Sequence, residues 1–288
     1  MQSIIEQITE WLKTMLVSGI MENVDGMFEA VNAQVSDVAG NVGMTPAEFS
    51  PEIFSMIQNI SETVILPIAG IILTFIACYE LIQMVIDHNN LANIDTWIFF
   101  KWIFKTAIAV ILLSNTFNIT MAIFDVAQHV INESGGLIST GTSIDSGMLS
   151  GMEEQLMTME VGSLLGVFLQ TFVVQIGTQI LAIVIFIIVY GRMIEIYLST
   201  SLAPIPLATL ANKEQGAMGQ NYLRSLMALG FQGFLIMICI GIYAVLIQSV
   251  SVSSDVMASL WGVLGYTVLL AFTLFKTGNL SKSIFNAH

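Results

Sequence analysis

Long apolar blocks are the feature that most constrains this chain. The stretch VILPIAGIILTFIACYELIQMVI (64–86) is one of several with few charged residues. A helix needs about 20 apolar residues to cross the roughly 30 Å hydrocarbon core of a bilayer, and these blocks lack the alternation of barrel strands. Only 10% of the residues are charged, against roughly a quarter in ordinary domains. The sequence therefore predicts an all-α, polytopic integral membrane protein.

We expect two regions in the chain. Residues 1–63 form an external, acidic, amphipathic helical region, because Ile4, Ile8 and Trp11 recur at helical spacing between glutamates. Residues 64–288 form the membrane domain, and 125–163 is an external loop with a short helix near Met152 to Met159. Five transmembrane helices are predicted, at about 64–86, 106–124, 164–190, 226–248 and 258–275.

The stretch VYGRMIEIYLSTSLAPIPLATLANK (189–213) resembles a sixth crossing but is too short for one. Ile196 to Ala211 is 16 residues, about 24 Å as a helix, and Pro204 and Pro206 interrupt its hydrogen bonds. We therefore predict a proline-broken, re-entrant or interfacial hairpin over 192–213. Non-helical backbone at membrane depth must be covered by protein or line a cavity.

Basic residues set the expected orientation, because lysine and arginine concentrate in cytoplasmic loops. With the N-terminus outside, five crossings and a cytoplasmic C-terminus, seven of the eight basic residues lie inside and only Lys13 lies outside. The same topology places 16 of the 21 acidic residues outside. Such a face repels a phosphate backbone, which disfavours direct binding of nucleic acid on that side.

Two predicted crossings carry polar side chains. They either line a hydrated conduit or form hydrogen bonds between helices, as polar residues in membrane helices commonly do. These candidates are Ser114, Asn115 and Asn118 in the second crossing, and Thr171, Gln175, Thr178 and Gln179 in the third.

Charged side chains inside the membrane need partners. Glu80 is expected to pair with Lys101 or Lys105 across the first two crossings; the alternative is a carboxylate that couples to protons. Arg192 and Glu195, three residues apart on one helix, can pair with each other, and Arg224 can also reach Glu195.

No enzyme, cofactor or metal site is predicted. The sequence contains no GxxxxGK[ST], HExxH or GxSxG motif. Cys78 and Cys239 lie far apart in apolar segments, and the three histidines show no metal-ligand spacing.

Several segments, in this order, resemble a known family: SETVILPIAGIILTF, NTFNI, VYGRMIEIYLSTSLAPIPLAT, GQNYLRSLMALGFQGFLIM and LFKTGNLSKSIFNAH. The chain is similar to the TrbL/VirB-type polytopic membrane proteins of type IV secretion, most closely to the conjugal-transfer branch of Gram-positive integrative elements. The order of the segments, with Arg-x-x-Glu before Pro-x-Pro, makes the resemblance specific.

The resemblance implies a channel or scaffold subunit that helps a DNA–protein substrate cross the cytoplasmic membrane. It implies a homo-oligomer with other secretion-system membrane subunits and cytoplasmic ATPases as partners, transient contact with the substrate, and no catalytic residues. The alternative is a stand-alone secondary transporter of a small solute, but no convincing internal repeat supports it.

Overall fold

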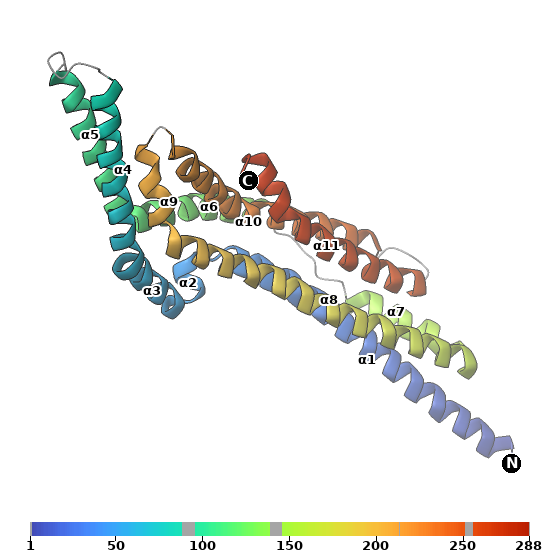
Figure 1. Ribbon diagram of the computed structural model, residues 1–288. Helices are drawn as coiled ribbons and strands as arrows, with labels where there is room; N and C mark the ends of the chain where they lie inside the picture. Colours follow the sequence, from blue (N-terminus) through green and yellow to red (C-terminus); the bar gives the residue numbers. More distant parts are fainter. Residues whose placement is uncertain (1, 88–95, 139–145, 213, 251–255, 288) are drawn as a thin grey trace. The chain divides into compact units, whose positions relative to one another are not determined.

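The structure is helical throughout its described secondary structure (Figure 1), which confirms the all-α class. This computed structural model describes residues 2–87, 96–138, 146–212, 214–250 and 256–287. The helices are α1 (Gln2–Val42), α2 (Pro46–Phe49), α3 (Pro51–Ile60), the π-turn η1 (Ser61–Ile65), α4 (Leu66–Asp87), α5 (Thr96–Ser114), α6 (Thr116–Ile138), α7 (Ser146–Met157), α8 (Val161–Leu202), α9 (Pro204–Ala208), the 3-10 turn η3 (Thr209–Ala211), α10 (Gly216–Val250) and α11 (Val256–Ile284).

Five of the described helical stretches are long and apolar enough to cross a membrane, which confirms the predicted number of spans. Many of their apolar side chains are exposed, including Ile71 at 72% and Phe104 at 68%, as expected for surfaces solvated by lipid. The five stretches are Pro51–Ile86, Trp97–Ser114, Val161–Leu202, Gly216–Ser249 and Met257–Ile284.

The second span differs from the predicted 106–124, because its helix breaks at Asn115. α5 ends at Ser114 and α6 begins at Thr116. The Asn115 side-chain amide donates to the Ile111 carbonyl at 2.8 Å, so a side chain competes with the backbone for that carbonyl. α6 then continues to Ile138, into the region expected to be loop, while α7 is the short helix expected there.

The predicted hairpin is shorter than 192–213. α8 continues through Arg192 and ends at Leu202, because Pro204 and Pro206 supply no N–H with which to continue the helical hydrogen bonds. α9 and η3 follow, and the next helix begins at Gly216. The break in the chain therefore lies after residue 202, and Lys213 lies outside the described residues.

The chain divides into two compact units, each built from three separate segments. Unit 1 comprises Met1–Val42, Ser134–Tyr190 and Ile236–Lys276; unit 2 comprises Gly43–Glu133, Gly191–Leu235 and Thr277–His288. The predicted division at residue 63, between an external region and the membrane domain, stays a prediction.

In unit 1, α1 packs along the first part of α8, and each of the two helices has a seven-residue repeat of buried residues. The buried residues Val17, Ile20, Val24, Met27, Val31, Gln34 and Val38 of α1 follow alternating steps of three and four. Leu164, Val167, Thr171, Val174, Thr178 and Ile185 of α8 are buried with the same spacing, and the half-buried Leu181 occupies the position between the last two. Such spacing keeps one seam of each helix against its neighbour.

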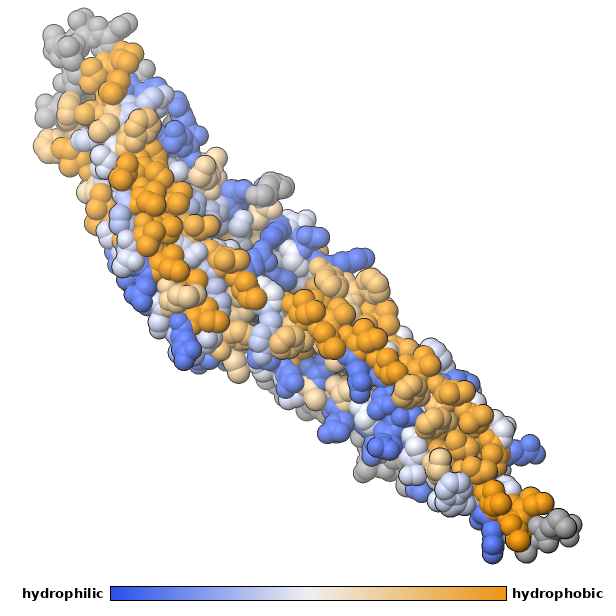
Figure 2. Space-filling model, turned by 60° about the horizontal axis from the view of Figure 1, so that its bottom comes forward, coloured by the Kyte–Doolittle hydropathy of each residue, from blue (hydrophilic) through white to orange (hydrophobic). Residues whose placement is uncertain are grey.

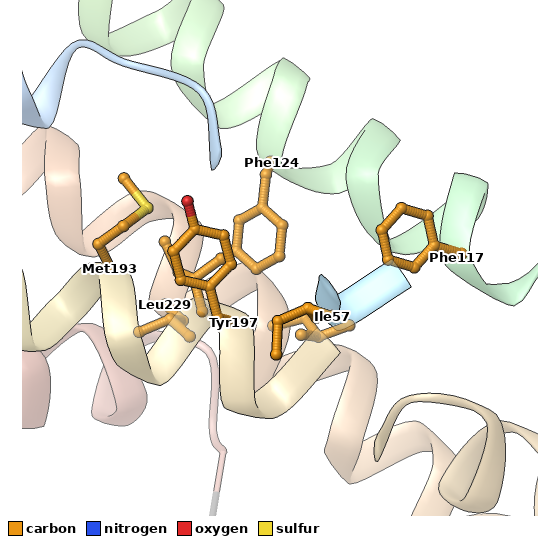
Figure 3. Close-up of a cluster of buried hydrophobic side chains, with 8 residues drawn as sticks. Ile57, Phe117, Phe124, Met193, Tyr197 and Leu229 are labelled. Atoms are coloured by element: carbon orange, nitrogen blue, oxygen red, sulfur yellow. The ribbon is translucent and has the colours of Figure 1, made fainter. Parts of the chain in front are cut away.

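Unit 2 has an apolar core in which four helices meet (Figure 3). Ile57 of α3, Phe117 and Phe124 of α6, Tyr197 of α8 and Leu229 of α10 are all less than 8% exposed. Full burial of a large apolar side chain stabilises the folded state by about 1.5–3 kcal/mol. The Tyr197 hydroxyl, the polar end of one of these side chains, donates to the Pro46 carbonyl at 2.6 Å.

The start of α2 next to this core is fixed by a capping box. The Thr45 backbone N–H donates to the Glu48 carboxylate at 2.9 Å, and the Glu48 N–H donates to the Thr45 hydroxyl. The hydrogen bonds from the backbone and side chain of Thr45 lower the pKa of Glu48. Their contribution to stability is present above the ordinary carboxyl pKa and is lost as the pH falls through the lowered one.

Small side chains let the hairpin pack closely on α4 and α5. Ala69, Ala109 and Ala208 share a buried cluster with Leu73 and Leu113, and the first three are at most 9% exposed. The Thr209 hydroxyl donates to the Pro206 carbonyl at 2.7 Å and accepts from the Gly219 N–H at 3.2 Å. The prolines therefore lie in protein-covered backbone, as required of irregular structure at membrane depth.

Replacing Gly219 with alanine should loosen this hairpin. A Cβ at Gly219 would lie 2.6 Å from the Pro206 carbonyl oxygen and 2.6 Å from Leu210 Cγ, so the backbone must move. We expect Gly219→Ala to lower the free energy of unfolding in bicelles by about 1–3 kcal/mol. Gly191→Ala is the matched control, since a Cβ there meets nothing within 4 Å. Equal stability of the two variants would contradict the close approach.

Candidate functional site

The polar residues predicted for the third crossing face α1. Asn23 Nδ2 donates to Thr171 Oγ1 at 3.2 Å, and a Cβ at Gly26 would lie 2.7 Å from Gln175 Nε2. Thr178 is fully buried and donates to its own helix at Val174 O. Thr171, Gln175 and Thr178 thus serve contacts between and within helices, whereas Gln179 is exposed.

The two helices run in the same direction. Gly19 lies against Phe168, Asn23 bonds Thr171, and Gly26 lies against Gln175. Farther along, Gln34 Nε2 donates to Leu181 O at 3.5 Å. The partners on α8 advance in the same direction as the residues of α1, seven residues from Phe168 to Gln175 against seven from Gly19 to Gly26. Residues 19–34 of α1 therefore lie beside α8 residues of the predicted third crossing.

An acidic stripe covers the outer side of α1. It consists of Glu22, Asp25, Glu29 and Asp37, all exposed. These residues lie on one side of the helix, away from the Ile20 to Val38 seam. No ion pair joins any of the four to a cation within the parts of the chain that the structure describes. Sequence reasoning missed this arrangement, although the alternating steps of three and four in α1 are visible in the sequence.

The polar residues predicted for the second crossing lie where three helix interruptions meet, in unit 2. Ser114, Asn115 and Asn118 line a hollow of about 30 Å³ together with Ser61 and Pro204. The hollow thus joins the α5–α6 break, the π-turn η1 and the α8–α9 break. Ser61 is 1% exposed and its hydroxyl has no hydrogen-bond partner among the described residues. Space of this size accommodates a water molecule. Pro206 follows two residues after Pro204 in α9.

The predicted intramembrane carboxylate is adjacent to a lysine. Lys105 Nζ lies 2.6 Å from Glu80 Oε1, and the Glu80 side chain is 19% exposed. Lys101, the other candidate partner, lies 6.0 Å from the centre of the Trp97 ring. The contact joins α4 to α5 through a lysine and a carboxylate in direct contact, so the geometry fits a structural ion pair.

Arg192 and Glu195 have different partners from those expected. Glu195 Oε1 accepts from Lys282 Nζ at 3.2 Å. Arg192 is 5% exposed; its Nε donates to Leu229 O at 3.3 Å and its Nη2 to Gly230 O at 3.2 Å. Glu195 lies on the exposed side of α8 and Arg192 on its buried side, so the two side chains do not pair. Arg224, the other candidate partner of Glu195, is exposed.

The described residues contain no group of three or more His, Cys, Asp or Glu side chains that could hold a metal ion. Cys78 is exposed, and both it and Cys239 are free thiols. What the structure provides instead is a set of apolar spans with polar groups at helix seams and helix breaks. Spans of this kind define a multi-pass helical membrane protein.

The family described as TrbL/VirB6 plasmid conjugal transfer like protein matches residues 31–204 of the chain. The chain belongs to this family and is a membrane subunit of a conjugal transfer machine, in which it works with other subunits. No curated protein and no solved structure shows significant similarity to it. The matched residues include the three helix interruptions and the α8 side of the α1–α8 seam, together with the part of α1 from Val31 onward.

The Asn23–Thr171 hydrogen bond gives a prediction about the seam. In a double-mutant cycle, Asn23→Ala and Thr171→Val should show a coupling energy of about 0.6 kcal/mol, and at most about 1.7 kcal/mol, as for other hydrogen bonds in membrane proteins. Unfolding by steric trapping in bicelles measures it. Gln179→Ala, exposed on the same helix, should change stability little. Additive effects of the first two substitutions would argue against the contact.

Proposed function

We propose that this protein is a channel subunit of the conjugation machine, and that it helps a DNA–protein substrate cross the cytoplasmic membrane as a homo-oligomer. Its N-terminus is outside and its C-terminus is in the cytoplasm, in keeping with the distribution of basic residues. Cytoplasmic ATPases supply the energy, since the sequence has no phosphate-binding loop motif of its own.

The observation that carries the proposal is the acidic stripe on α1. Asp25 and Glu29 lie beside the part of α8 that contains Thr171 to Thr178, within the predicted third crossing. Carboxylates at membrane depth face a bundle interior or a water-filled cavity, because contact with hydrocarbon costs several kcal/mol. On the α8 side of the α1–α8 pair, the apolar side chains of Val173 and Ile180 are each 56% exposed. Lipid therefore covers α8, and water covers α1.

An acidic wall suits the passage of DNA. Phosphate groups bind where lysine and arginine neutralise them, and residues 14–100 contain neither. A wall that repels phosphate does not retain the substrate, so a force from the ATPases moves it without breaking strong contacts. One copy of α1 forms only part of this wall, so several copies of the chain are required to form a ring that encloses an aqueous path.

Thiol labelling tests which side of the α1–α8 pair meets water. In a variant without native cysteines (C78A and C239A), Asp25→Cys should react with a charged, membrane-impermeant thiosulfonate about tenfold faster or more than Val173→Cys, since the reaction needs a hydrated thiolate. The two positions lie at the same level of the pair. Protection of Asp25→Cys in the assembled machine, with fast labelling of Val173→Cys, would refute the proposed lining.

The hairpin provides a second test of the channel role. Replacing both Pro204 and Pro206 with leucine should extend α8 and close the break that contributes to the hollow beside Ser61 and Asn115. We expect conjugation frequency to fall while the amount of protein inserted in the membrane stays unchanged. Pro51→Leu is the control, because this exposed proline is the first residue of α3, where its missing N–H matters little. An unchanged conjugation frequency in the double variant would show that the hairpin serves only in packing and has no role in transfer.

A further inference from the structure

The largest of the hollows described in unit 2 lies beside the Glu80–Lys105 ion pair. It has a volume of about 390 Å³ and is bounded by α4, α5 and the turn before α10. Pockets for small ligands commonly measure about 300–1,000 Å³. The residues that matter for its chemistry are Tyr79, Glu80, Lys101, Trp102, Lys105 and Glu214.

Hydrogen bonds hold the walls of this hollow in place. Trp102 Nε1 donates to Ala77 O at 3.2 Å, and Gln83 Nε2 donates to the Tyr79 hydroxyl at 2.7 Å. Asn212 Oδ1 accepts from the backbone N–H of Glu214 at 2.7 Å. The site is therefore formed before any ligand arrives, which lowers the entropy that binding must overcome.

The charges of the hollow are balanced. Two cations, Lys101 and Lys105, stand with two carboxylates, Glu80 and Glu214. The two salt bridges found among the described residues involve neither Lys101 nor Glu214. A ligand with only negative or only positive charge would meet repulsion from half of these groups. A ligand that carries one charge of each sign meets a partner for both.

The surroundings are those of a lipid headgroup. The two helices that line the hollow also carry exposed apolar side chains: Ile82 and Ile86 on α4, and Phe100 and Phe104 on α5. Figure 2 shows apolar side chains gathered over the α4–α5 end of the visible face. Lysines and aromatic rings together are typical of the membrane–water interface, and basic pockets between membrane helices bind phospholipid headgroups.

We propose that this hollow binds the headgroup of a zwitterionic aminophospholipid, phosphatidylethanolamine. Lys101 and Lys105 donate to the phosphate oxygens, and the ligand's primary ammonium donates to the Glu214 carboxylate. The acyl chains lie along the exposed apolar side chains of α4 and α5. A quaternary choline headgroup has no N–H to donate, so it binds less tightly.

Lipid retention measures this site directly. The full-length protein is incubated with mixed vesicles of phosphatidylethanolamine, phosphatidylglycerol and phosphatidylcholine, transferred to detergent, and analysed by native mass spectrometry. We expect phosphatidylethanolamine to be retained preferentially, and the Lys101→Gln/Glu214→Gln double variant to retain about tenfold less of it, since hydrogen bonds to charged groups are lost. Lys276→Gln, an exposed lysine outside the hollow, should retain as much as the unaltered protein.

Other results would overturn the proposal. Equal retention of the three lipids would show that the protein does not select the headgroup. Equal retention by the double variant and the unaltered protein would show that the lipid binds elsewhere. Displacement of the lipid by glycerophosphoethanolamine, which has the headgroup without acyl chains, would indicate a soluble ligand. Circular dichroism melting in the same detergent checks that the double variant is folded. A variant that melts early is replaced by Glu214→Gln alone, which leaves every basic residue in place and must still weaken retention.

Discussion

A polar group beside hydrocarbon has no water to bond, so each one must find its partner within the protein. This constraint accounts for the main features of the structure. Asn23 meets Thr171 across the α1–α8 seam, and Lys105 meets Glu80. Arg192 reaches two backbone carbonyls of α10. In each case a long side chain or a small neighbouring residue brings two segments together that are distant in the sequence.

The Arg192 contact shows how much depends on such partners. Its guanidinium fits against α10 because Gly233 has no side chain: a Cβ there would lie 2.7 Å from Nη2 and 2.5 Å from Ile131. A buried cation without partners costs several kcal/mol, whereas a guanidinium that donates to carbonyls recovers part of that cost. The contact fixes the second part of α8 against α10, on the same stretch of helix that ends at the hairpin.

The sequence predicted what depends on local composition. The five apolar blocks, the short α7 and the interruption at Pro204 follow from hydrophobicity and from the chemistry of proline. The break at Asn115 could not be inferred in the same way, because asparagine is also common in continuous helices, and its effect depends on the bond to Ile111. The partners of polar side chains are harder to predict from the sequence than the helices that carry them. Thr171 and Gln175 suit a conduit or a neighbouring helix equally well, and only the position of α1 decides between the two.

The seven-residue repeat in α1 limits how the length of this helix can change. Its buried seam and its acidic stripe are two sides of one helix, and both are in step with α8 through Gly19, Asn23 and Gly26. Insertion of a single residue before Leu16 leaves the seam intact. The same insertion between Gly26 and Gln34 turns the following segment by about 100° and brings Asp37 toward the apolar seam. Only insertions of about seven residues, or multiples of seven, preserve both sides at once. The spacing between Ile20 and Val38 is therefore as much a part of the protein's chemistry as the identity of its carboxylates.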